Sequence, residues 1–156
     1  MKLVIAHLSD IHFRKNSKHS VSNKVGSIAN AIHSSAPQAK AVALAFTGDI
    51  AFAGLRDEYA IAEVFVNELV RKLRIKYSAE SDIKLFFVPG NHDCDLSGDQ
   101  EAREAVLDAV SPSKLEKNSI VQALAKPQSE FYAFLDRLSH EVHHNGAEVV
   151  STKMYQ

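Results

Sequence analysis

The sequence is short of cysteine and of long apolar runs. Its single cysteine, Cys94, excludes an internal disulfide and is typical of a reducing compartment. No run approaches the roughly 18 apolar residues that a membrane span needs. The N-terminal apolar run is too short for a signal peptide and has no small-residue cleavage site. These absences predict a cytoplasmic, soluble protein with no membrane partner.

Net charge is also nearly absent, at -1 over 156 residues, of which 46% are hydrophobic and 24% charged. This is ordinary globular composition, and the length suits one domain with a sizeable core. The charge neither supports nor excludes a nucleic-acid partner, because a local basic groove is compatible with a balanced total.

Three short apolar runs predict buried strands, at residues 3–8, 41–46 and 84–88. Apolar residues at helical spacing predict a helix over residues 21–34 between the first two strands. A second, long helix opens at Asp57-Glu58, since acidic residues suit the positive end of the helix dipole. The alternation of strand and helix predicts an α/β fold, with a parallel or mixed sheet flanked by helices.

The second helix should bury one face, made of Ile61, Val64, Phe65, Leu69 and Leu73. Beyond residue 95 the pattern changes to three successive helices, at residues 99–110, 113–126 and 129–144. Another strand is expected to start at Ala147. We therefore expect a core at 1–95, a helical insertion or cap at 96–146, and the start of a further, truncated strand at 147–156.

Each predicted strand is followed by side chains of the kind that bind metals: Asp10 and His12, then Asp49, then Asn91, His92 and Asp93. Ligands bind at the carboxyl ends of parallel strands, where these side chains should converge. Asp10 and His12 are two residues apart, so in extended backbone their side chains point the same way. Taken singly, residues of these types after a strand more often belong to a turn or cap a helix. Taken together, they favour a metal site.

The candidate ligands are carboxylate, imidazole and amide groups, with no thiolate. Such mixed oxygen and nitrogen donors suit manganese, iron or zinc. Several acids around one crevice can hold two divalent cations, a pair that activates water and stabilises the oxygens of a displacement at phosphorus. The donor set is therefore compatible with a two-metal site.

The motifs Asp10-Ile11-His12, Gly48-Asp49 and Gly90-Asn91-His92-Asp93 resemble the first three motifs of the calcineurin-like metallophosphoesterases. The resemblance implies that Asp10 and His12 bind one metal, that Asp49 bridges both, and that Asn91 binds the second. It implies a catalytic His92, which stabilises phosphoryl oxygens or protonates the leaving group, with Asp93 orienting it. The implied fold is part of the metallophosphoesterase sandwich.

The family's later motifs, a histidine after a further strand and then Gly-His-x-His, have no match here. The downstream histidines His140, His143 and His144 end a predicted helix, where cationic histidine is favourable, and we interpret them as structural. We therefore expect an N-terminal half of a longer enzyme, or a site that a partner subunit completes. The chain alone should be inactive or weak.

The segment Ala51-Phe52-Ala53-Gly54, followed by Glu58-Tyr59, is similar to the corresponding segment of bacterial cyclic-nucleotide phosphodiesterase-like members. This favours a phosphodiester or nucleotide substrate. Two alternatives stay open: a DNA nuclease, and a non-catalytic regulatory or scaffold domain that retains the fold. The basic residues Arg14, Lys15 and Lys18 follow the first motif. They could meet substrate phosphate or form a solvated surface loop.

Overall fold

A four-stranded parallel sheet forms the centre of the computed structural model, which describes residues 2–15, 21–98, 101, 104 and 125–150. The spatial order equals the chain order: β1 (Leu3–Leu8), β2 (Ala41–Thr47), β3 (Asp82–Val88) and β4 (Ala147–Val150). The predicted α/β class is confirmed, and every pairing among the described strands is parallel. The strand expected at Ala147 is present.

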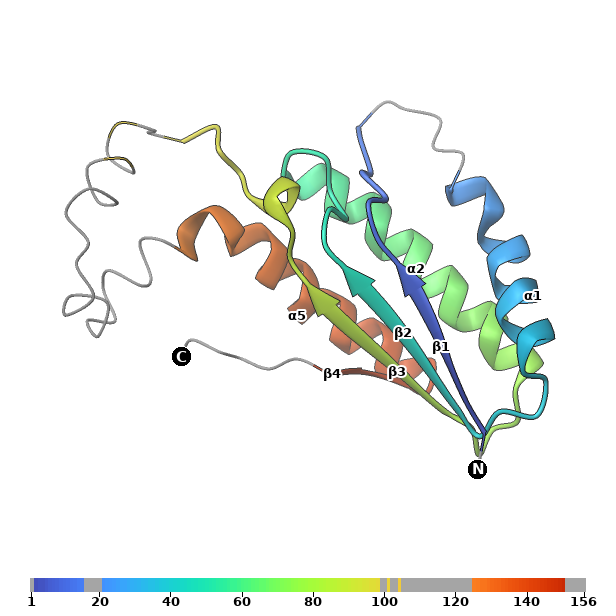
Figure 1. The fold of residues 1–156 in the computed structure, drawn as a ribbon. Coiled ribbons are helices and arrows are strands. Elements are labelled where there is room, and N and C mark those ends of the chain that lie inside the picture. Colours follow the sequence, from blue (N-terminus) through green and yellow to red (C-terminus); the bar gives the residue numbers. More distant parts are fainter. Residues whose placement is uncertain (1, 16–20, 99–100, 102–103, 105–124, 151–156) are drawn as a thin grey trace.

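Three long helices pack behind this sheet in Figure 1: α1 (Val25–Ser35), α2 (Arg56–Lys76) and α5 (Ser129–His144). The first begins later than predicted, after a 3-10 turn at Ser22–Lys24, and the last has the predicted bounds. The helices predicted at 99–110 and 113–126 fall almost wholly outside the described residues. Within the described part of the chain, no helix combines the length and the apolar character of a membrane span.

The sheet buries the face that carries the helices. In β2 the large apolar residues Val42, Leu44 and Phe46 are buried, and the intervening alanines are half-buried. In β3, Ile83 and Leu85 are buried in the same way. Alternate residues of a strand point to opposite faces, so this pattern fixes which face meets the core.

The buried face of α2 differs from the prediction. Val64 was expected in the core but is 71% exposed, and Ile61 is only partly buried. Small and branched residues at four-residue spacing, Ala62, Val66 and Val70, face the core instead. Because residues four apart share one side of a helix, this row turns Val64 outward. The predicted burial of Phe65, Leu69 and Leu73 is confirmed.

Helix α5 belongs to the same core as the sheet. Phe134 stacks on Tyr59 of α2 at 5.1 Å between ring centroids, and Arg137 pairs with Glu63 at 2.6 Å. Residues 129–144 therefore pack within the core and not beside it. The division of the chain at residue 96 stays a prediction.

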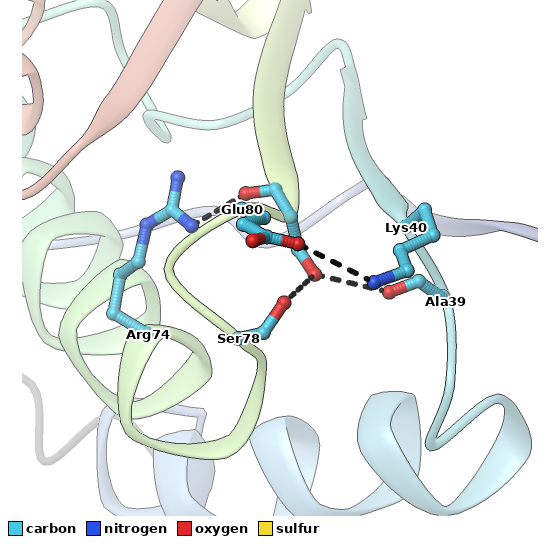
Figure 2. A network of polar contacts seen from close by, with 6 residues as sticks. Ala39, Lys40, Arg74, Ser78 and Glu80 are labelled. Atoms are coloured by element: carbon cyan, nitrogen blue, oxygen red, sulfur yellow. Dashed lines mark hydrogen bonds and ion pairs between the residues drawn. The ribbon is translucent and has the colours of Figure 1, made fainter.

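The turn between α2 and β3 lies at the end of the sheet where β1, β2 and β3 begin (Figure 1). Ser81 is buried there and donates to the Ala39 carbonyl at 3.1 Å, while Arg74 donates to the Ser81 carbonyl at 2.5 Å (Figure 2). Lys40 and Glu80 form a longer, exposed ion pair at 3.8 Å. These contacts join the starts of β2 and β3.

The other face of the sheet is not covered by any described element. It exposes apolar side chains from β1 and β3, with exposed fractions of 53% for Leu3, 65% for Ile5, 39% for Phe86 and 57% for Val88. His7 lies on this face and hydrogen-bonds Thr47 at 2.5 Å. We call it the open face. A contiguous exposed apolar area of this kind marks a contact surface or an association hazard.

Replacing Ile5 and Val88 together by threonine should reduce self-association and binding of the dye ANS. The change should alter the free energy of unfolding by only about 0.5 kcal/mol, because both side chains are exposed. Leu44→Ala on the buried face is the matched control and should cost about 3 kcal/mol. Sedimentation and urea unfolding measure both effects. A double variant as destabilised as Leu44→Ala would contradict an uncovered face.

Candidate metal centre

The loops that follow β1 and β2 are joined by backbone hydrogen bonds. The N–H groups of Asp10, His12 and Phe13 donate to the carbonyls of Gly48, Asp49 and Ile50, at 3.2, 2.9 and 2.8 Å. The pairing of β1 with β2 thus continues, irregularly, past the ends of both strands. The loops lie at the carboxyl edge of the sheet (Figure 1), as the sequence predicts.

The loop after β3 approaches these two because glycine stands at the point of contact. A Cβ atom on Gly90 would lie 2.2 Å from Asp49 Oδ1 and 2.6 Å from the Asp49 nitrogen. Gly48, at φ 89°, faces Gly90 from the other loop, where a Cβ would lie 3.1 Å from Gly90 Cα. The approach lets the His92 N–H donate to Asp49 Oδ1 at 3.0 Å, which fixes that carboxylate.

Three predicted site residues meet at this contact. His12, Asp49 and His92 each offer a ligand atom, and these atoms all lie within 4.8 Å of one another. The rings of His12 and His92 are 4.7 Å apart between centroids and nearly perpendicular. All three residues are partly buried. We call them the triad.

The triad suits a divalent cation. Its donors are two imidazoles and one carboxylate, a set used by manganese, iron and zinc. His12 Nδ1 is buried and has no hydrogen-bond partner among the described residues. A buried polar atom without a partner costs free energy, which a metal ligand bond would recover.

The backbone conformation of the predicted ligands differs from the expectation. Asp10, His12 and Asp49 all have left-handed φ angles, of 54°, 53° and 54°. The prediction that extended backbone directs Asp10 and His12 the same way is therefore wrong, because β1 ends at Leu8. Left-handed backbone is uncommon outside glycine and clusters at functional sites.

Two predicted ligands lie outside the triad. Asp10 is exposed, and its N–H pairs with Gly48. Asn91 is also exposed and begins the 3-10 turn Asn91–Asp93. Both flank the triad in the chain, so their roles as ligands stay predictions. His140, His143 and His144 are exposed on the last turns of α5.

Asp93 does not orient His92, contrary to the prediction. Its fully buried carboxylate accepts four hydrogen bonds: from the N–H groups of Ile50, Ala51 and Gly90 at 3.2, 2.9 and 2.9 Å, and from the Tyr59 hydroxyl at 3.0 Å. Each carboxylate oxygen thus has two donors. Asp93 ties the loops after β2 and β3 to each other and to α2.

His92 is oriented instead by a backbone carbonyl. Its Nδ1 lies 2.6 Å from the Phe52 oxygen. A carbonyl can only accept, so Nδ1 carries the proton, and the other ring nitrogen, Nε2, is left for a metal or a substrate. The Phe52 ring lies beside His92, at 5.3 Å between centroids.

Tyr59 and Glu58 also support the site, although their hydrogen bonds to it were not predicted. Burial, and then the Asp93 charge, raise the pKa of the Tyr59 hydroxyl far above its usual range, so it remains a donor. The buried Glu58 accepts from the N–H groups of Ala53 and Leu55 at 2.8 and 3.3 Å. An acid in the first helical turn is the signal that predicts this cap.

Comparison with known proteins agrees with the motifs and the fold. A family model described as calcineurin-like phosphoesterase matches residues 3–147. No curated protein and no solved structure gave a significant match. The chain belongs to the calcineurin-like phosphoesterase family.

Asp93→Asn should destabilise the protein by about 2–4 kcal/mol, because the amide NH₂ would face donors that now share a carboxylate. Tyr59→Phe, which removes one of the four hydrogen bonds, should cost only about 1 kcal/mol. Urea unfolding followed by circular dichroism measures both changes. Equal losses in the two variants would contradict the central role of the carboxylate.

Proposed function

We propose that this calcineurin-like phosphoesterase hydrolyses a phosphodiester or nucleotide with the help of two divalent cations, manganese, iron or zinc. The convergence of His12, Asp49 and His92 carries the proposal. A domain retained only as a scaffold has no need for three ligand-type side chains in this arrangement or for an unpartnered His12 Nδ1.

The residues divide the binding between them. His12 and Asp10 would bind the first cation, and Asn91 would bind the second. Asp49 would bind both cations. When bound, such a pair lowers the pKa of water and neutralises charge on phosphoryl oxygens. The His92 N–H holds Asp49 Oδ1 in place, so the bridging carboxylate is positioned by the catalytic residue's own backbone.

His92 would act on the substrate through Nε2. With Nδ1 held by the Phe52 carbonyl, the ring cannot turn without losing that hydrogen bond. Nε2 is then the atom that can hold a proton for a phosphoryl oxygen or give it to the leaving alkoxide. Asp93 contributes indirectly, since it fixes the loop on which His92 stands.

A two-cation site would need more donors than the described residues bring together. Two cations require further ligands, and the open face shows where additional structure can pack. We propose that a C-terminal segment or a partner subunit covers this face and supplies those ligands. By itself the chain would hydrolyse its substrate only slowly.

Removal of triad ligands should remove metal binding. His12→Ala and Asp49→Asn should each weaken Mn²⁺ affinity by more than about 10-fold, because the first deletes a proposed ligand and the second replaces a charged carboxylate by a neutral amide. His140→Ala removes an exposed histidine of α5 and is the matched control. Isothermal titration measures the affinities. Unchanged Mn²⁺ binding in both triad variants would refute the metal site.

Hydrolysis of bis-p-nitrophenyl phosphate with Mn²⁺ tests the reaction. We expect slow turnover that Asp49→Asn abolishes and that His92→Asn lowers by about 100-fold, the usual contribution of a proton donor. Asn cannot supply that proton. The release of p-nitrophenol measures the rate, and turnover that survives Asp49→Asn would contradict the proposed mechanism.

A further inference from the structure

Arg14 stands beside the triad, on the ring of Phe52. Its guanidinium carbon lies 3.2 Å from the centroid of that ring. The same ring lies 5.3 Å from the His92 ring and 6.0 Å from the His12 ring. One aromatic side chain therefore contacts both a cation and two members of the triad.

The next residue in the chain is placed differently. Lys15 Nζ pairs with Asp57 Oδ2 of α2 at 2.5 Å, and both side chains are more than half exposed. Its charge is thus matched by a carboxylate on a helix. The two basic neighbours differ in position, and it is Arg14 that lies at the triad.

The stacked geometry suits recognition of phosphate. A guanidinium stacks through its flat face, while its N–H groups lie in its plane and can bind two oxygens of one phosphate. Stacking also holds the long side chain, which reduces the entropy lost on binding. Phe52 is itself fixed, since its carbonyl binds His92 and its N–H donates to the Phe13 carbonyl at 3.1 Å.

We propose that Arg14, positioned by Phe52, binds a second phosphate of the substrate, adjacent to the phosphate at the triad. This inference rests on the proposed function. The guanidinium lies on the Phe52 ring, whose centroid is 5.3 Å from that of His92, so Arg14 would meet a group attached to the reacting phosphoryl. Two sources share this chemistry: the neighbouring phosphate of a nucleoside diphosphate and the next phosphate of a nucleic-acid strand.

The test compares ligands with one and with two phosphates at a fixed free Mn²⁺ concentration. Inorganic phosphate is the one-phosphate probe. The two-phosphate probes are α,β-methylene-ADP, for adjacent phosphates, and 5′-phosphorylated dithymidine with a phosphorothioate linkage, for phosphates one sugar apart. Isothermal titration gives Kd for the unmodified chain, Arg14→Ala, Phe52→Leu and the matched control Lys15→Ala.

Arg14→Ala should weaken binding of a two-phosphate probe by about 10-fold and of inorganic phosphate by about twofold or less. Phe52→Leu keeps the backbone carbonyl and should weaken the same probe by about threefold. Lys15→Ala should leave all affinities unchanged. The probe that shows the larger loss identifies the source of the second phosphate.

Equal losses for one- and two-phosphate probes in Arg14→Ala, or equal effects of Arg14→Ala and Lys15→Ala, would overturn the inference. A chain that binds Mn²⁺ and phosphate but gives such a result leaves the proposed function standing. A chain that binds neither Mn²⁺ nor any probe overturns both.

Discussion

The buried carboxylate of Asp93 is the constraint on which the site depends. Burying an isolated charge costs several kcal/mol, and four donors offset that cost here. Three of the donors belong to the loops that carry Asp49 and His92. The positions of these two candidate site residues are therefore set by a residue that need not touch metal or substrate. We therefore expect Asp93 to affect function by positioning Asp49 and His92.

Local strain accompanies this constraint. Three non-glycine residues hold left-handed backbone, at a cost of about 1–3 kcal/mol each, and all three are predicted ligands. The hydrogen bonds between the loops after β1 and β2, and the close approach of Gly48 and Gly90, hold them in that conformation. The packing of the sheet against its helices offsets the free-energy cost of this strained backbone.

The sequence predicted those features that leave a periodic or local signal. Strands appeared as apolar runs because one face is buried, and the parallel sheet then placed Asp10, Asp49 and His92 at one edge. Apart from Gly90, the partners of Asp93 and His92 were missed because they lie 34 to 43 residues away in the chain. Nothing near Asp93 signals that Tyr59 will bind it. The sequence likewise does not predict a left-handed backbone at an aspartate, because the surrounding loop imposes that conformation.

Among the strands that the structure describes, β2, β3 and β4 each pair with the one that precedes it in the chain. A chain leaving the ribosome N-terminus first therefore adds strands at one growing edge. The loops that carry Asp10, Asp49 and His92 follow β1, β2 and β3, so all three residues precede α5 in the chain. Phe134 of α5 stacks on Tyr59, the partner of Asp93. The residues of the candidate site thus come from one part of the chain, and the core contact that supports Asp93 comes from a later part.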